Sequence, residues 1–441
     1  MTAATGRMRR LIPVIALVGA GVLAITGCSA SGGGSASGGA GDGKFSYLGQ
    51  TENTTIINTL ETLSKDQCTA EEKAAPLTSD SIAGTQWDQK LQLLAGQDAL
   101  SNMSMSAGTP DLMKQLIKSG QVVDLTEKLD KLGVADAVLP AAASAIKALY
   151  GQDDLYVLPT ELNIEGFWYN KQLLADNGIT EAPATWDELV ADAATLQSAG
   201  VQPFAADGKD GWPITRLVGN YIFRDLGADA LKKVADGDAK LTDAEYVKAA
   251  DAVAELGKNG YFGDAVGSVD YNAAMNEFLT GQAGFFYMGS WALANFNDAD
   301  QNKIGADNIG FAPFPAVEGG QGSIDEVPAN VGIPVMFAKK GFGAAQDDWL
   351  KCIATNYGDT VLKDSGVVSG FALSEQPADL PATTQIVQDT IKNAPSSVLW
   401  FEALLTSKAT SVSQTNGGSL ANGTLSGADF MKLVQDANDA G

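Results

Sequence analysis

The 441-residue sequence contains no histidine. Without imidazole, the chain has no histidine general base, no Ser-His-Asp or Cys-His nucleophile system and no histidine-ligated zinc. Basic residues are also scarce, with 29 Lys and Arg against 53 Asp and Glu and a net charge of −24. Because binding to phosphate backbones needs a clustered basic surface, this balance argues against a nucleic-acid partner. The 45% hydrophobic and 19% charged residues are typical of a soluble globular protein of roughly two to three domains.

The first 28 residues have the pattern of an export signal. Three arginines lie among residues 7–10 and precede an apolar run over residues 11–25. This run is shorter than the about 20 residues of a membrane-spanning helix and matches a signal segment. It ends in the letters ITGC at 25–28, which resemble the bacterial lipobox, where the cysteine is lipidated and becomes the new N-terminus. We expect a lipoprotein signal peptide at 1–27 and a lipid on Cys28; the alternative is an ordinary signal with an incidental cysteine.

Residues 28–43 follow as a stretch rich in serine and glycine. Such a composition predicts a flexible tether that leaves an attached domain free to tumble. An acidic protein is repelled by an anionic leaflet, so we expect the attachment to the membrane to come from the lipid. The expected location is the extracellular face of the bacterial cytoplasmic membrane.

Only two further cysteines exist, Cys68 and Cys352. In an exported protein they are expected to form one disulfide. Two buried free thiols remain the alternative. A bond would require the chain near both positions to belong to one domain.

Strands alternate with helices of about ten residues along the rest of the chain. Aromatic or aliphatic runs at 45–48, 100–106, 167–169, 285–288, 309–311 and 331–337 predict strands. Helical spacing is found at 55–63, 87–95, 110–119, 170–176, 216–256, 270–279, 344–355 and 383–392. This alternation is typical of α/β units with a mainly parallel sheet.

Several short motifs, taken in order, resemble the extracellular solute-binding proteins of ABC importers, in the carbohydrate-binding branch. They are LP at 158–159, WYNKQL at 168–173, TWDEL at 185–189, GVQPF at 200–204, FLTGQAG at 278–284 with GSW at 289–291, and FAPFP at 311–315. The resemblance covers essentially residues 45–441. It implies an α/β fold of the type II periplasmic-binding-protein kind, with two lobes joined by hinge strands and a cleft between them. The first lobe would take 44–158 and 318–370, and the second 159–317 and 371–441, which places Cys68 and Cys352 in one lobe.

A sugar cleft needs flat aromatic surfaces for the apolar faces of pyranose rings. Trp291 follows Gly289 and Ser290, where the resemblance implies a stacking tryptophan, and Trp400 resembles a second one. Trp212, in a polar loop, and Trp87, at a helix start, are further candidates, each with core packing as the alternative. The other three tryptophans lie within patterned strands or helices and are expected in the core: Trp168, Trp186 and Trp349.

Polar ligand contacts are expected at strand ends. Glu52 and Asn53 follow the first strand, Asn330 precedes the strand after the second hinge, and Asn163 lies where the resemblance places an acidic ligand residue. Solvated turn or cap positions are the alternative for each.

The resemblance therefore implies a receptor, without catalysis, cofactor or metal, that binds a sugar and delivers it to an ABC transporter permease. We expect an oligosaccharide ligand and a monomer. Two alternatives stay open. A secreted glycoside hydrolase needs only two carboxylates, and a binding protein for another solute, such as a peptide, would have the same architecture.

Overall fold

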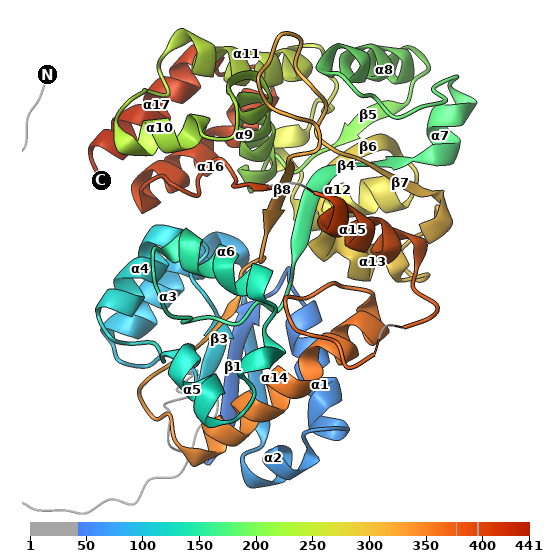
Figure 1. Cartoon of the computed structure of the whole chain (residues 1–441). Coiled ribbons are helices and arrows are strands. Elements are labelled where there is room, and N and C mark those ends of the chain that lie inside the picture. Colours follow the sequence, from blue (N-terminus) through green and yellow to red (C-terminus); the bar gives the residue numbers. More distant parts are fainter. Residues whose placement is uncertain (1–42, 376, 395–396) are drawn as a thin grey trace, which may run out of the picture. The chain divides into compact units, whose positions relative to one another are not determined.

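The computed structural model describes residues 43–375, 377–394 and 397–441 (Figure 1). The signal peptide expected at 1–27, the lipidated Cys28 and all of the tether except Gly43 lie outside the described residues. The described part is built around two β-sheets, and we name the part around each sheet the first and the second lobe. This confirms the predicted two-lobe α/β architecture.

The first lobe surrounds a four-stranded sheet in the order β2-β1-β3-β9. The strands are β1 (Phe45–Gln50), β2 (Leu77–Ile82), β3 (Met103–Met105) and β9 (Val335–Phe337). β1 runs parallel to both β2 and β3, whereas β9 is antiparallel to β3. Its helices are α1 (Thr55–Lys65), α2 (Thr69–Ala74), α3 (Trp87–Gly96), α4 (Pro110–Lys118), α5 (Leu125–Lys131), α6 (Pro140–Tyr150) and α14 (Ala344–Ser365).

The core of the first lobe joins the beginning of the chain to a segment about 300 residues later. The indole of Trp349 on α14 stacks on Phe45 of β1, with 4.8 Å between the ring centroids. Its N–H donates to the carbonyl oxygen of Ala75 at 2.9 Å. Cys68, directly before α2, forms a disulfide with Cys352 on α14. The predicted bond is confirmed, and both cysteines lie in one lobe.

The second lobe surrounds a mixed six-stranded sheet. The strands β10 (Ser397–Val398), β8 (Val327–Asn330), β4 (Asn163–Asn170), β6 (Ala283–Gly289) and β5 (Gln202–Ala205) follow one another in space, and β7 (Ile309–Ala312) also pairs with β4. β4 is antiparallel to β6, β7 and β8. The prediction of a mainly parallel sheet is therefore wrong for this lobe, because the central strand β4 runs antiparallel to all three of its neighbours.

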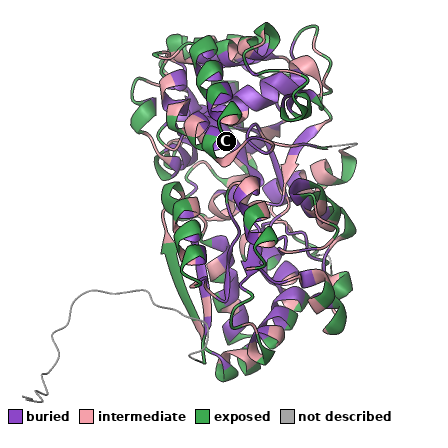
Figure 2. Ribbon diagram, turned by 90° about the vertical axis from the view of Figure 1, so that its left-hand side faces the viewer, coloured by how far each residue is buried: buried purple, intermediate pink, exposed green. Residues whose placement is uncertain are grey.

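Helices cover both faces of the second sheet. Successive side chains of a strand point to opposite faces, and on β4 Phe167 and Trp168 belong to two different hydrophobic clusters accordingly. The helices are α7 (Lys171–Asp176), α8 (Trp186–Ser198), α9 (Trp212–Leu226), α10 (Ala230–Asp236), α11 (Ala244–Lys258), α12 (Tyr271–Leu279), α13 (Leu293–Asn297), α15 (Ala382–Asn393), α16 (Ser407–Ala421) and α17 (Gly427–Asp439). Figure 2 shows the buried residues inside each lobe and the exposed ones on the outer helix faces.

Three segments cross between the lobes side by side. Leu158 exchanges backbone hydrogen bonds with Val335, at 2.8 and 3.1 Å, and Asn163 pairs with Asn330. The backbone N–H of Leu162 also donates to Val368 at 2.8 Å, which adds the segment after α14. We propose that the chain changes lobes at 158–163, 330–335 and 366–382. The second crossing then comes later than the expected residue 318, since β8 pairs within the second sheet.

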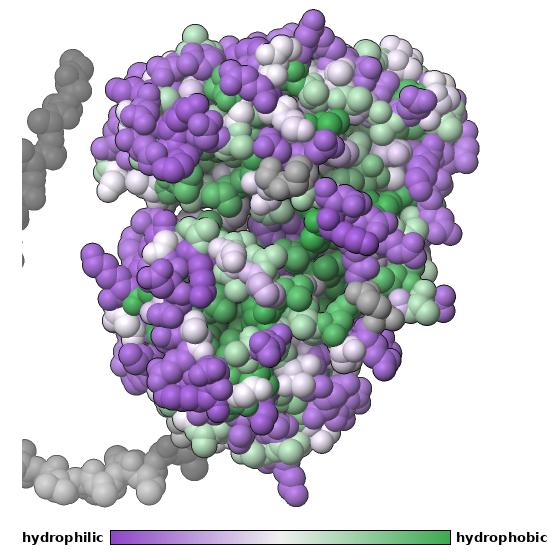
Figure 3. All heavy atoms as spheres, in the orientation of Figure 1, coloured by the Kyte–Doolittle hydropathy of each residue, from purple (hydrophilic) through white to green (hydrophobic). Residues whose placement is uncertain are grey.

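Among the described residues, no helix is long and apolar enough to cross a membrane. The surface is hollowed between the two lobes, on the side that carries α4 and α16 (Figure 3). This hollow leads to the cavity that holds the candidate site.

Candidate functional site

A cavity of about 1170 Å³ lies between the lobes and is lined by residues of both. Seven of the eight predicted ligand residues border it: Glu52, Asn53, Trp87, Trp212, Trp291, Asn330 and Trp400. The eighth, Asn163, does not. Residues from distant parts of the sequence are thus brought to one site by the two sheets and their crossing segments.

Three partly exposed tryptophans form an aromatic wall on the second lobe. Trp212 opens α9, Trp291 follows β6 and Trp400 follows β10. The rings of Trp212 and Trp291 lie 5.7 Å apart, tilted by 58°. A Cβ atom at Gly289 would come within 2.0 Å of the Trp291 ring, so only glycine lets this indole fold back over its strand. The wall offers flat apolar surface beside polar groups, as sugar rings require.

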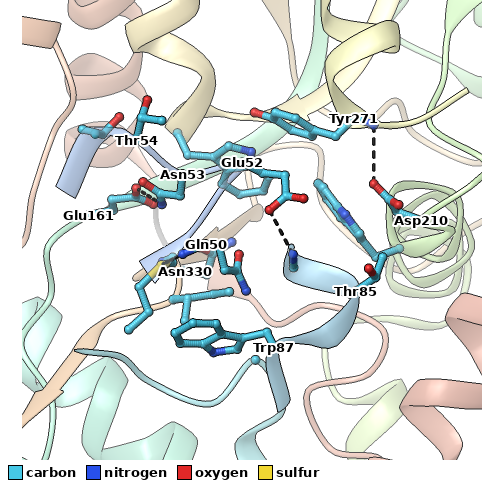
Figure 4. Close-up of a pocket in the computed structure, with 18 of the residues that line it drawn as sticks. Gln50, Glu52, Asn53, Thr54, Thr85, Trp87, Glu161, Asp210, Tyr271 and Asn330 are labelled. Atoms are coloured by element: carbon cyan, nitrogen blue, oxygen red, sulfur yellow. Dashed lines mark hydrogen bonds between the residues drawn. The ribbon is translucent and has the colours of Figure 1, made fainter. Parts of the chain in front are cut away.

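Trp87 differs from these three, because it is 1% exposed. Its indole N–H donates to the carbonyl oxygen of Ser106 at 2.7 Å. The ring borders the cavity from within the core of the first lobe (Figure 4). Trp168, Trp186 and Trp349 are buried as predicted.

Glu161 is a buried carboxylate that the sequence reasoning missed. Its Oε1 accepts a hydrogen bond from Asn53 at 3.0 Å (Figure 4), and its Oε2 accepts one from Asn163 at 2.8 Å. Burial raises the pKa of Glu161, and the two amide donors act against that rise. Its position two residues after the hinge Pro159 was the only sequence signal.

Asn163 supports this carboxylate from behind the cavity wall. It is 1% exposed, and its Oδ1 accepts a hydrogen bond from Ser290 at 3.0 Å. Because both ends of its amide are hydrogen-bonded within the protein, we propose that Asn163 positions the Glu161 carboxylate. Asn330 is also engaged, since its Nδ2 donates to Glu165 at 2.7 Å and its Oδ1 accepts from the N–H of Gly332 at 2.7 Å.

Glu52 projects into the cavity from the loop after β1 (Figure 4). Its Oε2 accepts a hydrogen bond from the backbone N–H of Gly84 at 2.9 Å, which leaves Oε1 available to a ligand. This carboxylate belongs to the first lobe and lies opposite the aromatic wall. The position agrees with the role predicted for it, which stays a prediction.

Tyr271 and Asp210 complete the second-lobe side, and neither was predicted. The backbone N–H of Tyr271 donates to Asp210 at 3.4 Å (Figure 4). Burial raises the pKa of the Tyr271 hydroxyl, and Glu161 adds to the rise. The hydroxyl therefore stays protonated and can donate a hydrogen bond to a ligand.

Behind them, Asp207 is fully buried. Its Oδ1 accepts from the backbone N–H of Asp210 at 2.9 Å, and its Oδ2 has no hydrogen-bond partner among the described residues. Burial, with a smaller contribution from the Asp210 charge, raises the pKa of Asp207 to about 8. This carboxyl group therefore carries a proton at neutral pH.

Arg216 is a further residue that the sequence reasoning missed. It lies one turn after Trp212 on α9 and borders the cavity. Helical spacing of four residues places both side chains on one face, a signal that the sequence already contained.

One group of potential metal ligands is present in the described part of the chain: Cys68, Glu71 and Cys352. Because the two sulfurs are bonded to each other, they offer no thiolate. This group lies outside the cavity lining.

Solved structures with a similar fold include a chitin oligosaccharide binding protein, with a TM-score of 0.79 and 24% identity over 90% of this chain and 98% of that one. The GacH receptor of Streptomyces glaucescens, solved unliganded and with acarbose, has a TM-score of 0.70 and 18% identity over 89% and 97% of the two chains. At these identities the likeness shows the fold. It agrees with the predicted type II architecture.

The sequence matches to two curated relatives cover less of the chain than the structural matches do. A probable sugar-binding periplasmic protein of Rhizobium meliloti is 28% identical over 207 residues, which are 46% of this chain and 47% of the relative. An uncharacterized ABC transporter extracellular-binding protein of Pyrococcus horikoshii is 26% identical over 156 residues, 35% of this chain and 34% of the relative. The matches span less than half the length of either relative.

A model of the bacterial extracellular solute-binding protein family matches residues 75–341, more than half of the chain. The motifs had predicted this family from the sequence, and the two lobes with a cavity between them have its architecture. The chain belongs to the bacterial extracellular solute-binding proteins.

Proposed function

We propose that this protein is an extracellular receptor that binds a sugar between its lobes and delivers it to the permease of an ABC transporter. The observation that carries this proposal is the cavity wall of three partly exposed tryptophans, Trp212, Trp291 and Trp400, facing polar groups of the first lobe. Aromatic faces suit the apolar faces of sugar rings, and carboxylates and amides suit their hydroxyl edges. The name of the Rhizobium meliloti relative supports the same ligand class.

The ligand is an oligosaccharide in this proposal. The cavity volume of about 1170 Å³ exceeds the roughly 300–1,000 Å³ that is typical of sites for drug-sized ligands. Several separate tryptophans also provide more than one stacking surface. A ligand of several rings would use this length better than a monosaccharide would.

Binding is proposed to occur without turnover. Both oxygens of Glu161 accept hydrogen bonds from amide groups, so this carboxylate is already engaged by the protein itself. Family membership supports the same conclusion, because the family is one of binding proteins. The ligand stabilises the closed arrangement through its contacts with both lobes, and the permease then meets both lobes of a monomeric receptor.

Isothermal titration against a panel of oligosaccharides tests the proposal. The panel contains malto-, cello-, xylo-, galacto- and chito-oligosaccharides, and a peptide library serves as the alternative ligand class. We expect saturable binding of at least one oligosaccharide and no change in its length after prolonged incubation. Release of shorter products would favour a glycoside hydrolase, and binding of peptides alone would favour a different solute.

Attachment to the extracellular face of the membrane through Cys28 is part of the same proposal. Its support is the lipobox-like sequence at 25–28 and the serine- and glycine-rich stretch after it. Cys28→Ala in the full chain should release the protein from membranes into the medium. Continued membrane association of that variant, with wild type and Cys28→Ala compared by fractionation, would contradict the lipid anchor.

A further inference from the structure

Arg216 borders the cavity with hydrogen-bonding capacity that the rest of the protein leaves unused. Its side chain is 15% exposed, and its Nε and Nη1 atoms are buried without a hydrogen-bond partner among the described residues. A guanidinium group has five N–H donors, and unsatisfied buried donors are energetically unfavourable. Because Nε and Nη1 are closed to solvent, a ligand oxygen in the cavity would meet the exposed end of the guanidinium.

Two aromatic rings fix the guanidinium in place. Its carbon lies 5.1 Å from the ring centroid of Trp400 and 5.7 Å from that of Trp212. The two rings come from separate segments, one at the start of α9 and one after β10. A sugar ring stacked on either tryptophan would therefore bring its oxygen atoms beside the Arg216 donors.

The positive charge of Arg216 is already balanced from behind. Oε2 of Glu165, a residue 1% exposed, lies 3.7 Å from Nε. Glu165 also accepts hydrogen bonds from the Tyr287 hydroxyl at 3.1 Å and from Asn330 at 2.7 Å. Burial raises the pKa of Glu165, and the Arg216 guanidinium acts against that rise.

A second buried carboxylate lies close enough to interact with Glu165. Glu402 is 2% exposed and accepts hydrogen bonds from the hydroxyl groups of Thr215 and Ser413. Glu52, Glu161 and Asp210 add further carboxylates to the cavity lining. The arginine thus offers donors without a surplus of positive charge, since a buried charge must be matched by its surroundings.

We infer that Arg216 determines specificity by donating to uncharged sugar oxygens, and that its balanced charge makes the cavity discriminate against sugars with a carboxylate at that position. The inference rests on the proposed function and narrows the ligand class to neutral oligosaccharides. Hydroxyl, ring and acetamido oxygens are the acceptors that the guanidinium would hold.

The test uses the tightest-binding neutral hexose oligosaccharide of the panel and the same oligosaccharide oxidised at C6 to uronates. Wild type should bind the neutral form at least tenfold more tightly. Arg216→Gln should weaken binding of the neutral form at least tenfold, because the paired donors are lost. Glu165→Gln keeps the shape of the side chain and removes its charge, so the preference for the neutral form should fall at least fivefold.

Arg216→Lys and Lys258→Gln complete the set. Lysine keeps the charge but not the planar group of donors, so affinity for the neutral sugar should fall while the preference for neutral over oxidised sugar is kept. This variant tests the inference independently of whether Glu165→Gln folds. Lys258, exposed on α11 and outside the cavity lining, is the control for loss of one positive charge and should leave both affinities unchanged.

The outcomes distinguish a failure of the proposed function from a failure of the role inferred for Arg216. If wild type binds no oligosaccharide, the proposed function is overturned. If wild type binds a neutral sugar but prefers the uronate, or if Arg216→Gln binds as tightly as wild type, only the role of Arg216 is overturned.

Discussion

Trp291 packs against the edge of the core, lies partly exposed at the cavity and folds back over Gly289. Trp291→Ala should therefore weaken oligosaccharide binding at least tenfold, about 1.4 kcal/mol, through loss of stacking surface. The measurement is isothermal titration, with the unfolding temperature recorded in parallel.

Trp349→Phe is the matched control, because Trp349 is fully buried in the first lobe. It should lower the unfolding temperature and leave the sugar affinity of the folded protein intact. Unchanged affinity in Trp291→Ala would show that the ligand lies elsewhere.

Asp207 links pH to stability. Its folded pKa of about 8 lies above the ordinary 3.8, so the folded state holds a proton that the unfolded state releases between these values. The contribution to stability is complete below about pH 4 and is lost as pH rises toward 8. Asp207→Asn mimics the protonated form. It should raise the free energy of unfolding at pH 8.5 by more than about 1.4 kcal/mol, the equivalent of one pKa unit.

Urea unfolding of wild type and Asp207→Asn at pH 5 and pH 8.5 measures this effect. The difference between the two proteins should be larger at pH 8.5. Exposed Asp66→Asn is the control and should not reproduce it. An equal difference at both pH values would contradict the raised pKa.

The sequence located single residues unevenly. Trp212 was predictable, because a large aromatic side chain between glycine and proline stands out from a patterned core. Trp291 and Trp400 were predicted from the resemblance to the family, since the apolar neighbours of Trp400 would by themselves suggest a core residue. Glu161 and Asp207 did not stand out, since a carboxylate looks alike in a solvated loop and in a buried wall. Their roles depend on burial and on amide partners such as Asn53, more than 100 residues away from Glu161.

At the scale of elements, α16 packs against the loop that carries part of the site. A Cβ atom at Gly418 would lie 2.3 Å from the backbone oxygen of Gly208, too close for any ordinary contact. Gly418→Ala should therefore displace the 208–211 loop, which holds Lys209 and Asp210. We expect a loss of about 1–3 kcal/mol in stability and weaker sugar binding.

Gly96→Ala is the matched control for this substitution. Gly96 ends α3, and a Cβ atom there would meet nothing within 4 Å. Alanine should be neutral or stabilise the helix by up to about 1 kcal/mol. Thermal unfolding of both variants measures the effect on stability. If Gly418→Ala had the stability and sugar affinity of the wild type, the close packing at this position would be contradicted.

Most elements with strong local patterns were predictable. Thr185 caps α8 with the reciprocal hydrogen bonds of a capping box, as its TWDEL motif indicated. β2 was missed, because its sequence LTSDSI is polar and the strand is largely exposed at the edge of the sheet. α16 was missed too, since its serine, threonine and glycine residues favour turns, and only the packing of α9, α11 and α17 makes it helical.

At the scale of the whole molecule, the two lobes also touch directly across the mouth of the cavity. The Ser407 hydroxyl, at the start of α16, donates to Asp111 on α4 at 3.0 Å and lies 3.3 Å from the Thr109 hydroxyl. These contacts favour the arrangement in which the lobes are close. Ser407→Ala should shift the ligand-free protein toward an open form and weaken sugar binding up to about fivefold, the equivalent of one hydrogen bond of about 1 kcal/mol.

Small-angle scattering of the ligand-free protein measures the opening as a larger radius of gyration. Ser198→Ala is the control, since that hydroxyl bonds within its own helix α8. Identical scattering and affinity in Ser407→Ala and wild type would show that the contact has no effect on closure.

The contact between Phe45 and Trp349 affects the order in which the lobes can fold during synthesis. β9, α14 and the disulfide partner Cys352 all come after most of the second lobe. The first lobe, although it begins the described chain, therefore acquires a complete core only after most of the second lobe has been made. During synthesis, its early strands wait for about 300 residues with their apolar faces uncovered. A nascent chain that finishes folding so late stays extended for the time in which a translocation channel could accept it.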